Sequence, residues 1–149
     1  MWLLWTIVLF VHVSAATFWV GGQLMLTFVI MPLLRRNAPA ELVGPLARLS
    51  GRRFAKISNW GLFPVLGLTG PLLAWHDGVR LHNLDHTSFG HVLEVKTLMV
   101  AVVLGLAGAH GAAAKRLSRR GARSLALLTI TLSLVIVALA AGLAILPTP

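Results

Sequence analysis

The stretch of sequence that decides the fold runs from Trp2 to Leu34 and reads WLLWTIVLFVHVSAATFWVGGQLMLTFVIMPLL, without one Asp, Glu, Lys or Arg residue. A helix needs about 20 consecutive apolar residues to cross the hydrocarbon of a membrane, and this stretch is longer than that. In lipid, every backbone polar group must be paired within the protein, which leaves helices and closed barrels. The stretch is too continuously apolar for a barrel strand, in which apolar and polar residues alternate. It therefore predicts a transmembrane helix.

Three further apolar stretches follow, and we expect spans at approximately 5–34, 57–76, 91–114 and 124–146. Only 11% of the residues are charged and 57% are hydrophobic, whereas a soluble domain has about a quarter of its residues charged. So few ionisable groups cannot cover a water-facing surface. The sequence thus predicts an all-α integral membrane four-helix bundle, with residues 1–149 forming a single transmembrane domain. The first span continues well past Val13–Ala16, a faint cleavage-site pattern, so we expect it to be retained.

The distribution of basic residues predicts the orientation. Six lie in the first connection and its flanks, namely Arg35, Arg36, Arg48, Arg52, Arg53 and Lys56, and five lie in the third, namely Lys115, Arg116, Arg119, Arg120 and Arg123. The second connection carries only Arg80, with Asp77 and Asp85. By the positive-inside rule the first and third connections are cytoplasmic, which puts the N-terminus and the C-terminus on the extracytoplasmic side of the cell inner (cytoplasmic) membrane. The net charge of +9 then reflects orientation, and we expect no nucleic-acid partner.

Two connections contain patterns of their own. Apolar residues recur at helical spacing over 40–49, which predicts a short amphipathic helix lying on the inner membrane surface. Between Asp77 and Gly90, Val79, Leu81 and Leu84 have near-helical spacing, which predicts a short ordered lid rather than a free loop.

Most of the ionisable residues within and beside the spans are expected to lie at a similar depth in the membrane. Counting about 20 residues from the basic boundary of each span puts five of them in one outer layer: His12, His76, His91, Glu94 and Lys96. The second connection adds His82 and His86, whereas His110 stands alone near the inner boundary and is expected to be structural. A single interfacial histidine or lysine more often simply reaches to water. For the whole set we favour a functional interpretation, because ionisable residues in spans usually face the bundle interior and mark function. Glu94 and Lys96 cannot both face one direction, and we expect Lys96 to point inward.

Three segments resemble the CopD-type copper-resistance membrane domain family. They are His12 with Phe18–Gly22 and Met31-Pro32, then Leu68-Thr69-Gly70, and then Thr87–Lys96 at the start of the third span. The match covers the first three spans and rests on the order and spacing of these motifs. The resemblance implies a four-helix domain connected with copper uptake or tolerance. A more distant similarity is to HemJ-type haem-associated membrane proteins, which pair a first-span histidine with a later lysine. This chain lacks the basic residue that usually opens their first span and the Arg after their Trp-Gly stretch.

Two functional hypotheses follow from these residues. The first is a copper site near the outer face, because imidazole and thioether groups suit copper, with the metal ligands His12, His76, His82, His86 and His91. The second is a b-type haem protein, HemJ-like or cytochrome-b-like, with a redox role. Haem needs one or two axial ligands from facing helices at equal depth, which makes His12, His76 and Lys96 the candidates. A third interpretation is a small membrane subunit that binds neither.

The sequence leaves open whether the protein is an enzyme. It contains no Ser-His-carboxylate arrangement for hydrolysis, and an oxidoreductase activity would depend on bound haem. The copper and haem hypotheses both imply membrane lipids around the protein and a periplasmic metal or haem donor protein as a partner. A homo-oligomer is the other association that the sequence leaves open.

Overall fold

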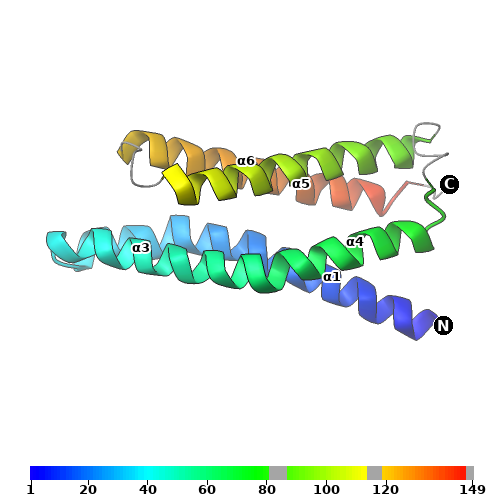
Figure 1. Ribbon diagram of the computed structural model, residues 1–149, viewed down its shortest axis with the longest axis horizontal. Coiled ribbons are helices and arrows are strands. Elements are labelled where there is room, and N and C mark those ends of the chain that lie inside the picture. Colours follow the sequence, from blue (N-terminus) through cyan, green and yellow to red (C-terminus); the bar gives the residue numbers. More distant parts are fainter. Residues whose placement is uncertain (81–86, 114–118, 147–149) are drawn as a thin grey trace. The chain divides into compact units, whose positions relative to one another are not determined.

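The computed structural model describes residues 1–80, 87–113 and 119–146, and all regular structure in these ranges is helical (Figure 1). The side chains of residues 108–113, 119–120 and 122 are not described. Two compact units divide the chain, Met1–Ala74 and Trp75–Pro149, and each is described by itself. Four helical stretches are long and apolar enough to cross a membrane: Trp2–Asn37, Ala40–His76, Ser88–Ala107 and Arg123–Leu143. The predicted all-helical, multi-pass membrane protein is therefore confirmed.

The first unit is an antiparallel helical hairpin. Its first arm consists of α1 (Trp2–Leu24), the π-helical segment η1 (Met25–Ile30) and α2 (Met31–Asn37). Its second arm consists of α3 (Ala40–Ile57), the π-helical segment η2 (Ser58–Leu62) and α4 (Phe63–His76). The chain reverses at Ala38, where ψ is 147°, because the following Pro39 excludes the helical conformation from the residue before it. Figure 1 shows the two arms side by side, with the turn at one end.

The structure corrects the prediction of a separate interfacial helix over 40–49. These residues are helical, but α3 continues through η2 into α4 without a break, since Ser58 and Phe63 both keep helical backbone angles. A rise of 1.5 Å per residue gives each arm a length of about 55 Å, against about 30 Å of hydrocarbon. The turn end of the hairpin is therefore longer than a membrane requires. The apolar spacing that suggested a surface helix belongs to this extension of the second arm.

Each π-helical segment ends two residues before a proline. η1 ends at Ile30, ahead of Pro32, and η2 ends at Leu62, ahead of Pro64. A proline has no N–H and its ring collides with the carbonyl four residues back, and a wider turn relieves that contact. At Pro32 and Pro64 the local response of the helix is a π-helical turn.

Three contacts fix how the two arms pair. Trp19, which is buried, meets Phe63 edge to face with ring centroids 5.5 Å apart. Gly22 lies under the ring of Phe54, so close that a Cβ atom at Gly22 would overlap it. His12 reaches α4, as described below. The contacts of Trp19 and His12 agree on one antiparallel register of the two arms.

The second unit contains α5 (Ser88–Ala113) and α6 (Arg119–Leu143), which pack against each other. Thr87 caps α5, because its hydroxyl accepts a hydrogen bond from the backbone N–H of Gly90 at 3.0 Å. Val103 and Ser133 are completely buried, and the Ser133 hydroxyl donates to the carbonyl of Thr129 at 2.8 Å. This bond satisfies a hydroxyl that would otherwise be costly to bury.

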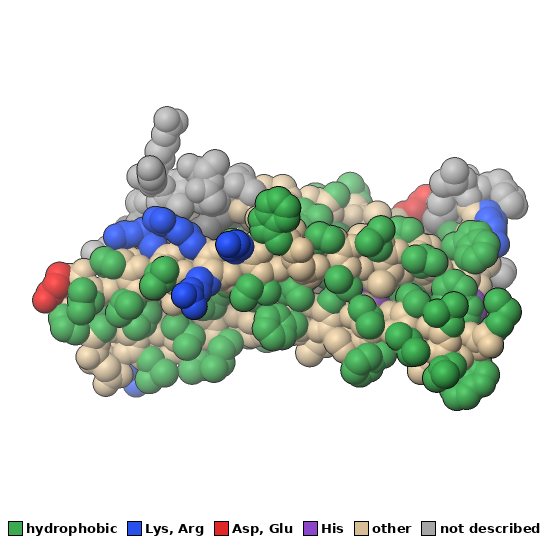
Figure 2. Space-filling model, turned by 60° about the horizontal axis from the view of Figure 1, so that its bottom comes forward, with side chains coloured by type: hydrophobic (Ala, Val, Ile, Leu, Met, Phe, Trp, Pro, Cys, Tyr) green, Lys and Arg blue, Asp and Glu red, His purple; other side chains and the backbone are tan. Residues whose placement is uncertain are grey.

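Most of the described surface is apolar. Figure 2 shows hydrophobic side chains spread along the face in view, whereas Lys and Arg side chains gather toward one part of it. The basic residues of the second arm, Arg48, Arg52, Arg53 and Lys56, are all exposed on α3. This pattern is typical of helices that face lipid and end in a basic interfacial layer.

Candidate functional site

The best-defined polar contact in the first unit joins His12 of α1 to Thr69 of α4. Nδ1 of His12 lies 2.7 Å from Oγ1 of Thr69, and the contact is partly buried. The Thr69 hydroxyl also lies 2.6 Å from the carbonyl oxygen of Val65, one turn earlier in α4. A histidine in an apolar helix is thus held by a hydroxyl on the neighbouring helix, as interhelical polar contacts in membranes commonly are.

The two bonds together determine which nitrogen of His12 carries the proton. A carbonyl oxygen can only accept, so the single hydroxyl proton of Thr69 is donated to Val65. The Thr69 oxygen then accepts from His12, which makes Nδ1 the protonated nitrogen of the neutral ring. The lone pair is therefore on Nε2. This is the arrangement in which a histidine binds a metal through Nε2 while its other nitrogen donates to an oxygen.

Gly70 lies beside the ring of His12. A Cβ atom at Gly70 would stand 3.4 Å from Cε1 of His12, which is ordinary van der Waals contact, and no other atom of the ring would come within 4 Å of it. The imidazole therefore lies with Nδ1 and Cε1 toward α4. Thr69 supplies the oxygen that orients the ring.

The level of His12 corrects the count of depth made from the sequence. That count makes His12 level with His76, but His12 bonds to Thr69, which lies seven residues earlier in α4. A helix rises 1.5 Å per residue, so about 10 Å along α4 separates Thr69 from His76. The expected equality of depth is therefore wrong. The error arose because Arg35 was taken as the boundary of the first span, although the pairing of the arms puts Lys56 opposite the end of α1.

His76 and His91 belong to the second unit, and both are exposed. Nδ1 of His76 lies 3.3 Å from Oδ1 of Asp77 and Nδ1 of His91 lies 2.9 Å from the carbonyl oxygen of Thr87. A carbonyl and an ionised carboxylate can only accept, so Nδ1 is again the donor in each pair. In all three described histidine side chains of the predicted site, Nδ1 is therefore the nitrogen that donates to a neighbouring oxygen.

Lys96 and Glu94 differ in burial as predicted. Lys96 is half-buried, whereas Glu94, two residues away on α5, is exposed. His12 belongs to the first unit and Lys96 to the second. The two residues of the predicted His12–Lys96 pair are therefore described separately. His82 and His86 lie outside the described residues, as does the side chain of His110, and the same holds for residues 81–86 of the predicted lid. Among the residues that are described, no three His, Asp or Glu side chains come together as a metal-binding group.

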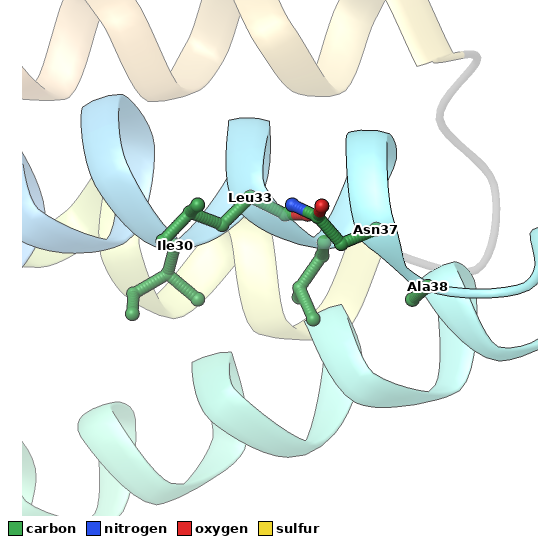
Figure 3. Close-up of a pocket in the computed structure, with 5 residues that line it drawn as sticks. Ile30, Leu33, Asn37 and Ala38 are labelled. Carbon is green, nitrogen blue, oxygen red and sulfur yellow. The ribbon is translucent and has the colours of Figure 1, made fainter.

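The two grooves in the surface of the first unit are apolar and lie away from His12. One, of about 360 Å³, is lined by Ile30, Leu33, Leu34, Asn37 and Ala38 beside the hairpin turn (Figure 3). The other, of about 470 Å³, is lined by Phe18, Gly21, Gly22, Met25, Leu26, Phe54 and Ile57. None of the residues that line these two grooves is titratable.

Sequence reasoning missed the role of Thr69. In the sequence, Thr69 stands out only as part of the Leu68-Thr69-Gly70 motif. Thr69 does bond its own helix, and it also accepts from His12. A signal was present, because Thr69-Gly70 supplies a hydroxyl and a side-chain-free position side by side in an apolar span.

A comparison of this chain with protein-family models, curated proteins and solved structures finds no match.

Proposed function

We propose that this protein is a metal-handling protein of the cytoplasmic membrane that binds copper through Nε2 of His12, in copper uptake or tolerance. The observation that carries the proposal is the His12–Thr69–Val65 chain of hydrogen bonds, which presents Nε2 as the nitrogen with the lone pair. Copper is bound well by imidazole nitrogen. The resemblance of the first three spans to CopD-type domains supports the same metal.

The depth of His12 supports a functional rather than an interfacial role. Lys56 is the basic residue nearest the middle of the hairpin, so we take it as the cytoplasmic boundary of the hydrocarbon. About 20 residues on, the other boundary falls at His76, and the paired arm then spans approximately Trp5 to Leu24. His12 lies about 10 Å inside that boundary by helical rise. A histidine at that depth is expensive to insert unless it has a compensating interaction.

The exposed histidines support capture of the metal from the extracytoplasmic side. In His76 and His91, as in His12, Nδ1 is bonded to an oxygen. Both are near the end of their span that carries few basic residues, which the positive-inside rule assigns to the extracytoplasmic face. We propose that these imidazoles capture the metal, together with His82 and His86 of the intervening connection. The two chain ends lie on that same face.

A b-type haem protein is the second candidate, and one observation favours it. The described residues hold no group of three metal-ligating His, Asp or Glu side chains, whereas haem iron needs only one or two axial ligands from the protein. His12 fits as an axial ligand, since its Nδ1 already donates to an oxygen as the proximal histidine's outer nitrogen commonly does. Bound haem would supply one-electron redox chemistry, and the residues of this chain would hold and orient it.

The test uses the full-length protein purified in lipid nanodiscs. We expect it to bind Cu(I) in titrations against a competing chelator, and we expect His12→Ala to lose that copper while remaining folded. Thr97→Ala is the control, because Thr97 is exposed on α5 and its hydroxyl donates to the carbonyl of Leu93 on the same helix. We expect this variant to retain the copper stoichiometry. An absorption spectrum of the purified protein is recorded in parallel.

The outcomes separate the candidates. A Soret band that disappears in His12→Ala supports the haem protein and refutes the copper assignment. If His12→Ala keeps full copper stoichiometry and an unchanged spectrum, while His82→Ala loses the metal, the site belongs to the second connection and the proposal fails.

A further inference from the structure

We infer that Thr69 is a positioning residue, which holds His12 in the Nδ1-protonated tautomer and thereby makes Nε2 the metal-binding atom. The part of the inference that concerns copper binding rests on the proposed function. The tautomer of His12 can be measured without any metal. It deepens the proposal by assigning a role to a residue that would not touch the metal.

The argument begins with the number of protons available. Thr69 has one hydroxyl proton, and two partners lie within 2.7 Å of its oxygen. The carbonyl of Val65 can only accept, and it sits one helical turn away on the same helix, where a threonine hydroxyl reaches it readily. Only His12 can then be the donor to Oγ1. The carbonyl of Val65 therefore fixes the direction of the Thr69 hydroxyl proton. Thr69 in turn fixes which ring nitrogen of His12 carries the proton.

The location makes this control effective. In water an imidazole exchanges its proton between the two nitrogens freely, with solvent as the alternative partner. Here the His12–Thr69 contact is partly buried between two helices and lies within the hydrocarbon depth derived above. A nitrogen that lost its partner there would be left with an unpaired polar group, which is costly in an apolar environment. The ring is therefore restricted to one tautomer.

A purely structural role predicts something different. An interhelical hydrogen bond in a membrane contributes to folding whichever partner donates, so removing it would weaken the hairpin without a defined effect on the metal. A positioning role requires that loss of the Thr69 hydroxyl change the proton on His12 and the binding of metal, and that a serine hydroxyl restore both.

The first experiment is nitrogen-15 NMR of metal-free protein labelled only at histidine, with the His12 signals assigned by their absence in His12→Ala. We expect wild type and Thr69→Ser to show Nδ1 protonated and Nε2 unprotonated. Thr69→Val, which keeps the shape and removes the hydroxyl, should show loss of the single tautomer. Thr97→Val is the matched control, because Thr97 donates to the carbonyl of Leu93 at 2.8 Å on α5 and is exposed. It should leave the His12 signals unchanged.

The second experiment is Cu(I) titration of the same variants. Loss of a group that orients a metal-binding histidine typically lowers metal affinity 10–100-fold. We expect a loss of roughly that size in Thr69→Val, near wild-type affinity in Thr69→Ser, and no change in Thr97→Val.

The two experiments distinguish failure of this inference from failure of the proposed function. Wild-type protein with the proton on Nε2 refutes the inference, whatever the variants do. So does Thr69→Val with an unchanged tautomer, or with a copper affinity that falls no more than in Thr97→Val. If instead His12→Ala still binds copper fully while Thr69 controls the tautomer, the positioning role stands and the copper function fails.

Discussion

Two adjacent glycines of α1, Gly21 and Gly22, differ in the space around them where the two arms of the first unit pair. A Cβ atom at Gly22 would overlap the ring of Phe54, with Cζ of that ring 2.7 Å away. A Cβ atom at Gly21 would meet nothing within 4 Å. Gly22→Ala and Gly21→Ala add the same methyl group to the same helix one position apart. The pair therefore isolates the contact between the arms from every effect of helix propensity.

The magnitude follows from two terms. Replacing glycine by alanine inside a helix stabilises it by about 0.5–1 kcal/mol, and this term is common to both variants. Inserting a methyl group where a ring already packs costs about 1–3 kcal/mol, and this term applies only to Gly22. We place the cost toward the lower end, because Phe54 borders the apolar groove of about 470 Å³ into which its ring can shift. Gly22→Ala should be less stable than Gly21→Ala by about 1–2 kcal/mol.

The assay is reversible unfolding of the purified variants in mixed micelles of increasing denaturing-detergent content, followed by helical circular dichroism. Phe54→Ala completes a double-mutant cycle, since removing the ring should abolish the difference between the two glycine variants. Equal stabilities of Gly21→Ala and Gly22→Ala, with the ring present, would refute the contact between the two arms at Gly22 and Phe54.

Two further predictions concern stability and topology. Ser58 is 3% exposed and its Oγ has no hydrogen-bond partner among the described residues, so Ser58→Ala should raise the free energy of unfolding by about 1 kcal/mol. Ser133→Ala removes a buried hydroxyl that donates to the carbonyl of Thr129, so it should lower the free energy of unfolding by a similar amount in the same assay. A lower free energy of unfolding in Ser58→Ala would show that the Ser58 hydroxyl is hydrogen-bonded. A periplasm-dependent reporter fused after Pro149 should be active, because the basic connections assign both chain ends to the extracytoplasmic face; activity of a cytoplasm-only reporter at that position would reverse the orientation.

The fold was predictable because lipid imposes two simple requirements. A span must be about 20 apolar residues long, and its backbone must be paired internally, so the stretch Trp2–Leu34 and its three successors could only be helices. The difference in burial between Lys96 and Glu94 was predictable for a similar reason, since two residues two positions apart cannot share a helix face. These inferences use only distances along one helix.

The candidate site was less predictable, because it depends on how two helices pair. The register between α1 and α4 decides whether His12 is level with Thr69 or with His76. Counting residues from the basic boundary of each span gives this register only if each span ends at its nearest basic residue. The first arm does not, since its apolar residues run on past the level of Lys56 to Leu34. The sequence therefore predicted the histidine and missed its partner.

The corrected register changes what His12 can do. At the membrane surface the imidazole would exchange protons with water, and either nitrogen could bind a ligand. At the level of Thr69 its Nδ1 faces a hydroxyl whose own proton is committed to the carbonyl of Val65. In the neutral ring the proton is then held on Nδ1, on the side of α4, and the lone pair belongs to Nε2. The helix pairing, rather than the solvent, therefore decides which nitrogen of His12 carries the proton.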